Sequence, residues 1–357
     1  MYNLDLGNQQ LNKELETKVE AQLASLEKAK YCLTTNSGVS SISIVLQLLN
    51  HGDCVAVQHD YYNGTRSLIN KIMNHRYTNV TLDQIDPYSQ LENLLSRPNN
   101  DIKLVFLESP SNPMMTIIDF ERISQICKKH KVISAADNTI CSPIYQNPLT
   151  HGIDIVIHSC TKYIGGHSDC VAGAICTKDE DIYKKMRYLR DITGQQTNQF
   201  NLYLMDQGLQ TLKIRAQRVH KNAIKIAEYL KSHPKVAKVY FPLFDTHAEI
   251  DIMKKQSTGY LGLISFHINT DDFDESCEFP KRLKMFEFGP SLGGVISSIE
   301  QQGTSHKSQF TPEDAIKRGF KDNLMRISVG IENAADLIAD LEQSLSKVKV
   351  IKYEPKL

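Results

Sequence analysis

Residues 135–173 read AADNTICSPIYQNPLTHGIDIVIHSCTKYIGGHSDCVAG, and this stretch decides the fold of the chain. It contains two short apolar runs, each of which ends in polar residues. Asp137 follows the first run, and Ser159, Thr161 and Lys162 follow the second. Short apolar runs bounded by turn residues are typical of buried strands. The stretch therefore predicts two strands that carry an acid and an amine at their ends.

Similar runs occur on both sides of this stretch, separated by segments long enough for a helix. The β-branched runs lie at residues 54–58, 79–85, 103–107, 132–136, 153–158 and 171–176. Strands that alternate with helices form βαβ units, which build a largely parallel sheet. The first half of the chain is therefore predicted to be a doubly wound α/β domain.

Helical spacing dominates the rest of the chain. Residues 12–31 are amphipathic, and the apolar positions between 202 and 230 predict one long helix, bent near Gly208 and ending before Pro234. Strand-like runs follow at 261–268 and 326–331, and residues 334–348 predict a final amphipathic helix. This pattern favours a second, smaller domain entered through the long helix. A coiled coil is the alternative for the long helix.

Composition excludes several classes of function. The chain has 357 residues, enough for two domains, with 41 basic and 41 acidic side chains. This balance argues against nucleic acid or an anionic membrane as the partner. No secretory signal and no apolar run of about 18 residues are present, which predicts a cytoplasmic protein. The eight cysteines form no CxxC pair, so no metal site is expected and the thiols are predicted to be reduced core residues.

Polar residues gather where the predicted strands end, at 60–66, 108–112, 137 and 159–162. Parallel sheets bind ligands at this edge. One such loop alone more often marks only the end of a strand, but four together favour a site. A lysine, a partly buried acid and nearby hydroxyls are what pyridoxal 5'-phosphate (PLP) requires for its covalent bond, its ring nitrogen and its phosphate. Ser37 and Gly38, at the start of a predicted helix, would add backbone N–H donors for an anion.

Six segments spread along the chain resemble one family. They are YNGT (62–65), ESPSNP (108–113), DNTICSPIYQNPL (137–149), SCTKYIGGHSD (159–169), SLGG (291–294) and LMRISVGIE (324–332). Together they are similar to the cystathionine γ-synthase/γ-lyase family, also called the Cys/Met metabolism PLP-dependent enzymes. The resemblance implies an α/β fold of the PLP-dependent transferase type (fold type I). In that fold a large, mainly parallel seven-stranded sheet domain with helices on both faces is followed by a smaller C-terminal α/β domain.

The resemblance also implies roles for individual residues. Lys162 corresponds to the lysine that binds the cofactor covalently, and Tyr62 to the tyrosine that stacks on its ring and assists the leaving group. Asp137 corresponds to the partner of the pyridine nitrogen. The implied cofactor-binding set is Gly38, Val39, Tyr62, Asp137, Ser159, Thr161 and Lys162. The implied substrate-binding set is Asn112, Ser291 and Arg326, with the arginine holding the α-carboxylate as a bidentate clamp.

Domain boundaries and assembly follow from the same resemblance. Residues 1–14 are expected to be a shortened N-terminal arm, 15–210 the PLP-binding domain and 211–357 the C-terminal domain. A homo-oligomer is implied, either a dimer or a tetramer with shared active sites.

The chain departs from the family at positions that influence substrate choice. The family's Tyr-Ser-Arg element before the first helix is absent, and residues 8–15 read NQQLNKEL. Pro290 and Ile296 stand where members that handle cystathionine often have glutamate, so a distal ammonium group loses its counter-charge. Gly64 stands where methionine γ-lyases often have cysteine.

The preferred hypothesis is γ-elimination or γ-replacement on a homoserine- or homocysteine-derived amino acid. A β C–S lyase is the first alternative, and a PLP-binding partner subunit with little turnover is the second.

Overall fold

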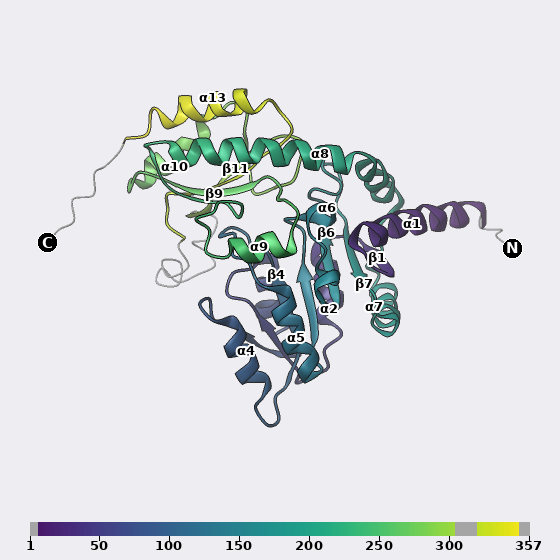
Figure 1. The fold of residues 1–357 in the computed structure, drawn as a ribbon. Helices are drawn as coiled ribbons and strands as arrows, with labels where there is room; N and C mark the ends of the chain where they lie inside the picture. The colour runs from purple at the N-terminus through teal and green to yellow at the C-terminus, as the bar shows by residue number, and fades with distance from the viewer. Residues whose placement is uncertain (1–5, 304–319, 350–357) are drawn as a thin grey trace. The chain divides into compact units, whose positions relative to one another are not determined.

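The structure is a computed structural model that describes residues 6–303 and 320–349, and the chain forms two compact units (Figure 1). The first unit comprises Met1–Asn112, Thr116–Lys213 and Asp251–Gly259. The second comprises Pro113–Met115, Ile214–Ile250 and Tyr260–Leu357. The changeover between Lys213 and Ile214 lies inside helix α8 (Gln199–Ser232), so one helix belongs to both units.

The first unit contains a seven-stranded sheet, which confirms the predicted α/β class. Its strands, in the order β1-β7-β6-β5-β4-β2-β3, are β1 Tyr31–Thr35, β7 Gly173–Thr177, β6 Ile155–Ser159, β5 Ile133–Asp137, β4 Ile102–Glu108, β2 Cys54–Val57 and β3 Thr78–Thr81. The pairs from β6 through β3 are parallel, whereas β7 is antiparallel to both of its neighbours. Strand β1 was missed by the six predicted runs because its TT end reads as the start of a hydroxyl-rich loop.

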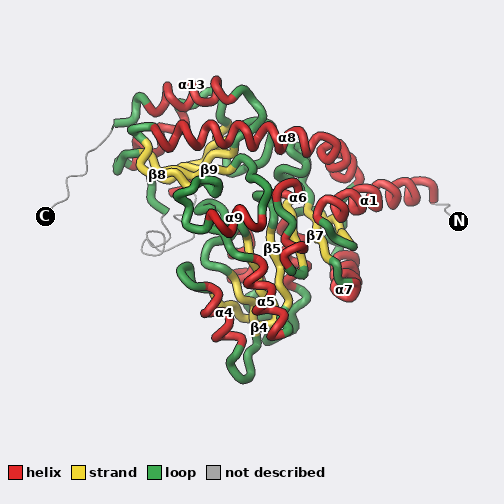
Figure 2. Tube along the Cα trace, in the orientation of Figure 1, coloured by secondary structure: helices red, strands yellow, loops and turns green. Residues whose placement is uncertain are grey.

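Helices cover both faces of this sheet (Figures 1 and 2). The helices of this unit, besides the first part of α8, are α1 Leu6–Glu27, α2 Gly38–Leu46, α3 Asn63–Ser67, α4 Pro87–Leu95, α5 Phe120–His130, α6 Ser142–Tyr145, α7 Glu180–Ile192 and α9 Ile250–Gln256, with a π-helix at Leu68–Ile72 and a 3-10 helix at Pro148–His151. Side chains of Ser37, Asp119 and Asp179 cap α2, α5 and α7 by accepting backbone N–H bonds.

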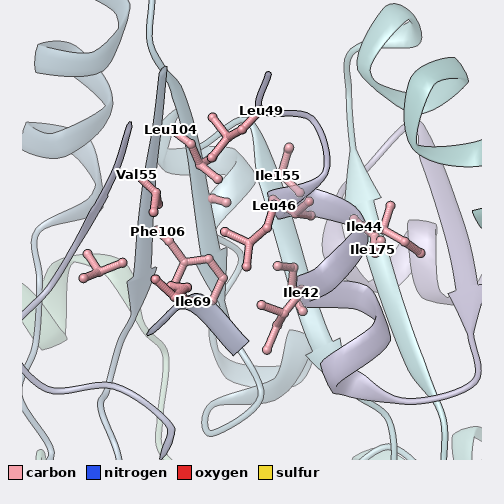
Figure 3. Close-up of a cluster of buried hydrophobic side chains, with 14 of the residues drawn as sticks. Ile42, Ile44, Leu46, Leu49, Val55, Ile69, Leu104, Phe106, Ile155 and Ile175 are labelled. Carbon is pink, nitrogen blue, oxygen red and sulfur yellow. The ribbon is translucent and has the colours of Figure 1, made fainter. Parts of the chain in front are cut away.

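Helix α2 packs on β6 and β7 over a cluster of buried apolar side chains (Figure 3). Alternate residues of each central strand face this cluster, because side chains in a strand point to opposite sides in turn. Phe106 of β4, Ala135 of β5 and Ile157 of β6 belong to this row, and all are fully buried. The same row therefore determines which face the last residue of each strand points to.

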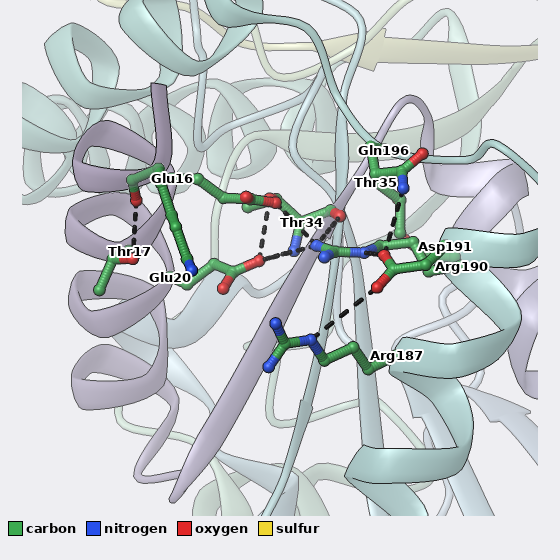
Figure 4. Close-up of polar contacts among 11 residues, drawn as sticks. Glu16, Thr17, Glu20, Thr34, Thr35, Arg187, Arg190, Asp191 and Gln196 are labelled. Carbon is green, nitrogen blue, oxygen red and sulfur yellow. Dashed lines mark hydrogen bonds and ion pairs between the residues drawn. The ribbon is translucent and has the colours of Figure 1, made fainter. Parts of the chain in front are cut away.

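Helix α1 begins at Leu6, so residues 6–14 are helical; residues 1–5 lie outside the described part. Side chains of α1 bind β1 and α7 through a charge cluster around the buried Arg190 (Figure 4). Arg190 Nη1 donates to Glu16 Oε1 at 2.8 Å, Glu20 Oε1 at 3.1 Å and the Thr34 carbonyl oxygen at 3.2 Å. Arg190 Nε donates to Asp191 at 3.0 Å. We call these four charged residues the α1–α7 cluster.

The second unit contains a five-stranded sheet in the order β10-β11-β12-β9-β8. Its elements are β8 Val236–Tyr240, β9 Leu263–Ile268, β10 Glu287–Phe288, β11 Ser298–Gln301, β12 Leu324–Ser328, α10 Phe273–Lys281 and α13 Ala334–Leu345. Strands β9 and β12 match the predicted runs, whereas β8, β10 and β11 were not predicted. Within the two described ranges, no helix is long and apolar enough to cross a membrane.

Candidate active site

The sheet register brings three polar side chains to one edge. Glu108 is paired with Asp137, and Asp137 with Ile157, so Ser159 lies two residues further along β6. Glu108, Asp137 and Ser159 continue the rows of Phe106, Ala135 and Ile157, and therefore point to the α2 face of the sheet. Because β2, β4, β5 and β6 are parallel, the four loops singled out in the sequence all leave the sheet at this carboxyl edge.

Asp137 is a buried acid, 8% exposed, whose hydrogen bond comes from the Thr139 backbone N–H at 2.9 Å. Burial raises the pKa of its carboxyl, and the bonds from Thr139 and the charge of His158 oppose that rise only in part. Among the described residues, no ion pair reaches Asp137. A buried carboxylate of this kind is stabilised by an external cation. The protonated pyridine nitrogen of PLP fits that requirement.

Gly38 and Ser159 meet at the start of helix α2. A Cβ at position 38 would lie 2.7 Å from Ser159 Cβ and 2.9 Å from its Oγ, so only glycine permits this approach. Ser37 caps the helix by accepting the Ser40 N–H at 3.1 Å, and Val39 is exposed beside it. A helix start with a nearby hydroxyl suits a phosphate group. Thr161 Oγ1 accepts the backbone N–H of Ala172 at 3.1 Å, which joins the turn after β6 to the residue before β7.

Lys162 is half-buried in a tight turn directly after β6. Its backbone N–H donates to the Ser159 carbonyl oxygen at 3.1 Å, and its own carbonyl accepts from Gly166 at 2.8 Å. Gly208 of α8 packs against this turn: a Cβ there would lie 2.5 Å from the Ile164 carbonyl oxygen. Helix α8 is continuous from Gln199 through Gly208 to Ser232, and the close approach to this turn explains why position 208 is a glycine. Neighbouring Cys160 is fully buried, and burial raises the pKa of its thiol, so it is a core residue rather than a nucleophile.

Tyr62 precedes helix α3 and is 44% exposed. A Cβ on Gly64 would overlap the Tyr62 ring, so glycine at 64 and this ring position depend on each other. A cysteine at 64 could be accommodated only if the ring moved.

Glu108 is a site residue to which the sequence assigned no role. Its carboxyl accepts the backbone N–H of Tyr62 at 2.7 Å and that of Asn112 at 3.0 Å. It therefore connects the loop of the candidate stacking residue to that of a candidate substrate-binding residue. The available signal was its place as the first residue of ESPSNP, directly after the apolar run of β4.

The other two candidate substrate-binding residues lie in the second unit. Arg326 of β12 is paired across the sheet with Glu300, and its Nη2 lies 2.9 Å from Glu300 Oε2. The same nitrogen donates to the Pro290 carbonyl oxygen at 2.8 Å, so Ser291 is next to an Arg326 contact. The Ile296 side chain is 51% exposed. The next residue, Ser297, donates to the Glu332 carboxylate through both its N–H and its hydroxyl.

The structure thus gathers Gly38, Tyr62, Asn112, Asp137 and Ser159 at one edge of the first sheet, with Lys162 in the turn that leaves it. Arg326 and Ser291 are brought together separately in the second unit. Among the described residues, no His, Cys, Asp and Glu group could hold a metal ion.

Comparisons with known proteins give one consistent result. Residues 11–346 match the family described as Cys/Met metabolism PLP-dependent enzyme. The cystathionine γ-lyase of Dictyostelium discoideum is 35% identical over 92% of this chain and 84% of its own length. The cystathionine β-lyase of Lactococcus lactis subsp. cremoris is 36% identical over 92% of this chain and 85% of its own length.

A solved structure agrees with these two relatives. The cystathionine γ-synthase of Xanthomonas oryzae pv. oryzae, in complex with aminoacrylate and cysteine, has a TM-score of 0.89 and is 33% identical. The match covers 94% of this chain and 86% of that structure.

Proposed function

This chain belongs to the Cys/Met metabolism family of PLP-dependent enzymes, and from that premise we propose that it catalyses γ-elimination or γ-replacement on a homoserine- or homocysteine-derived amino acid. The observation that carries the cofactor assignment is Asp137, a buried acid that forms no ion pair with the described residues. An acid in such a place is ionised at little cost only when a bound cation pairs with it. The family match supports the class of reaction.

The residues at the sheet edge divide the work among them. When bound, PLP supplies an electron-withdrawing ring that stabilises negative charge at the substrate Cα. Asp137 would hold the proton on the ring nitrogen, and Gly38, Val39, Ser159 and Thr161 would offer donors to the phosphate. The Lys162 amine would take the proton from the substrate Cα. The exposed Tyr62 ring would stack on the cofactor and give a proton to the departing sulfur or oxygen.

Substrate recognition is assigned to Asn112, Ser291 and Arg326. The Arg326 guanidinium is oriented by Glu300 and by the Pro290 carbonyl oxygen, which fixes the plane that a carboxylate would meet. An exposed Ile296 supplies an apolar side chain rather than a negative charge for the far end of the substrate. This favours substrates whose distal group is uncharged, such as an O-acylhomoserine or homocysteine.

β-Cleavage of a C–S bond remains the second candidate. The Lactococcus β-lyase is as similar to this chain as the Dictyostelium γ-lyase, at 36% and 35% identity. The products distinguish the two reactions on cystathionine. With water, γ-cleavage gives cysteine, 2-oxobutanoate and ammonia, whereas β-cleavage gives homocysteine, pyruvate and ammonia.

The test is a panel of amino acids, with products identified by mass spectrometry. Purified wild-type protein should be yellow and should release 2-oxobutanoate from homoserine- or homocysteine-derived substrates. Lys162→Ala should lose both the colour and turnover, because it removes the amine that would bind the cofactor and take the Cα proton. Lys178→Ala, which changes an exposed lysine just after β7, is the matched control and should retain both. Turnover that persists in Lys162→Ala would refute the assignment.

Assembly and location belong to the same proposal. We assign the enzyme to the cytoplasm as a homo-oligomer, and all eight cysteines are free thiols. Light scattering of the purified holoenzyme distinguishes a dimer from a tetramer.

A further inference from the structure

The Glu108 carboxyl holds two active-site loops at once. One oxygen accepts the Tyr62 N–H at 2.7 Å, and the other accepts the Asn112 N–H at 3.0 Å. We propose that Glu108 is a positioning residue that sets the cofactor-stacking loop and the substrate-binding loop in one fixed relation at the end of β4. The inference rests on the function proposed above and adds a residue to it.

The structure holds Glu108 itself firmly in place. It is 3% exposed, and Gln58 binds its backbone in both directions. Gln58 Oε1 accepts the Glu108 N–H at 2.8 Å, and Gln58 Nε2 donates to the Glu108 carbonyl oxygen at 2.6 Å. Gln58 Nε2 also donates to the Asp60 carbonyl oxygen, in the loop that leads to Tyr62. Because the carboxyl group can move little, it fixes the positions of the two N–H groups that it binds.

The charges around Glu108 make its burial costly, which argues against a filling role alone. Asp137 lies beside it on β5, and Asp60 lies in the loop after β2. Burial and these two acids raise the pKa of the Glu108 carboxyl well above its usual value, and the bonds from Tyr62 and Asn112 lower it by less. An apolar or amide side chain would avoid this cost. The carboxyl group accepts one N–H bond from each of two loops, and neither an apolar nor an amide side chain can accept both.

The variants Glu108→Gln and Glu108→Ala remove different numbers of the two N–H bonds to the Glu108 carboxyl. An amide of the same shape has one oxygen acceptor, so it can keep only one of the two N–H bonds. Alanine keeps neither. The matched control is Asp154→Asn. Asp154 accepts the Ser134 N–H at 2.9 Å and its hydroxyl at 2.7 Å, at the opposite end of β5.

The measurements are the dissociation constant for PLP, the visible circular dichroism of the bound cofactor, and kcat and KM. Glu108→Gln should weaken PLP binding or raise KM by about tenfold, and Glu108→Ala should do both. Asp154→Asn should leave all of them within about twofold while lowering the melting temperature. Far-UV circular dichroism confirms that each variant is folded. Equal changes in the Glu108 and Asp154 variants would overturn the proposal.

Double variants test whether Glu108 acts through the two loops. Once Tyr62→Ala has removed the ring, Glu108→Gln should cause little further loss of PLP affinity. Once Asn112→Ala has removed that side chain, Glu108→Gln should add little to KM. If the effects of the two single substitutions add in both double variants, Glu108 acts independently of these loops and is a general structural residue. A wild-type protein that binds PLP but turns over no substrate would refute the proposed reaction, and the Tyr62 pair would still test this inference.

Discussion

Two groups of charged residues in the first unit are stabilised in opposite ways. In the α1–α7 cluster, three carboxylates surround Arg190, so negative charge meets positive charge inside the chain. At the carboxyl edge of the sheet, the carboxyl groups of Glu108 and Asp137 are more deeply buried than these three, yet they accept hydrogen bonds only from neutral N–H groups. Among the described residues, neither forms an ion pair.

This difference in pairing distinguishes the α1–α7 cluster, which is structural, from the carboxyl edge of the sheet, which is the candidate binding site. Ions that are paired within the chain need no counter-ion from solution, and removing one partner of such a pair destabilises the fold. Buried acids without a cationic partner lower the stability of the free protein. Such acids are typical of binding sites, where a ligand supplies the positive charge. The two groups should therefore respond differently to substitution: one in stability, the other in activity.

Asp137→Asn should have the largest effect and should act on catalysis. An amide cannot hold the ring nitrogen protonated by ion pairing, so kcat/KM should fall by about 10²–10³-fold, equivalent to about 3–4 kcal/mol. Steady-state kinetics with saturating PLP measure this loss. The apoenzyme should be no less stable than wild type in urea, because the substitution removes an unpaired buried acid. An apoenzyme destabilised as strongly as the Arg190 variant below would remove the distinction between the two groups.

Arg190→Met should have the next largest effect and should act on stability. Removing the cation leaves Glu16 and Glu20 facing each other with no counter-charge, and breaking a buried pair costs about 3 kcal/mol. Urea unfolding measures the change. Arg187→Met is the control: Arg187 is exposed and reaches Asp191 only at 3.9 Å, so less than about 0.5 kcal/mol is expected. A fall in kcat at unchanged stability would contradict the structural reading of the cluster.

The smallest predicted effect is a pH dependence that arises from Glu20. Burial and the charge of Glu16 raise the pKa of Glu20 from 4.5 to about 7, despite the opposing influence of Thr34 and Arg190. Because the folded protein binds this proton more tightly, its contribution to stability is complete below 4.5 and is lost as the pH rises through about 7. The free energy of unfolding should therefore drop by about 2 kcal/mol between about pH 5 and pH 8.

Glu20→Gln isolates that contribution. The variant has no proton to lose at this position, so its unfolding free energy should change less over the same pH range than that of wild type. Urea titrations at the two pH values compare them. The prediction fails if both proteins show the same slope.

The sequence predicted the parts of the fold that depend on local pattern. Strands β4, β5 and β6 are short apolar runs that end in Glu108, Asp137 and Ser159, and both the runs and the polar ends are visible in the chain. Their meeting at one edge follows from parallel pairing. Strand β1 was not predicted because its last two residues are threonines. Strand β8 was not predicted because its residues are half-buried or exposed and show no apolar run.

Contacts between distant segments could not be read in the same way. The Gln256 side chain binds the backbone at Ile118 and Phe120, which ties residues 251–259 to the first unit. Glu108 likewise binds the backbone of other residues. A backbone N–H is present at almost every position, so the sequence gives no sign of which one a side chain will bind.

Gly208 makes no chemical contribution to the reaction, yet it should be as intolerant of change as Lys162. The missing side chain lets the helix touch the carbonyl oxygens of Ile164 and Gly165, and any other residue would push the lysine turn aside. In a library of random variants selected for growth on the product of this enzyme, position 208 would lose as many clones as a catalytic position. Ranking positions by such losses would therefore not distinguish the residues that react from the one that gives them room.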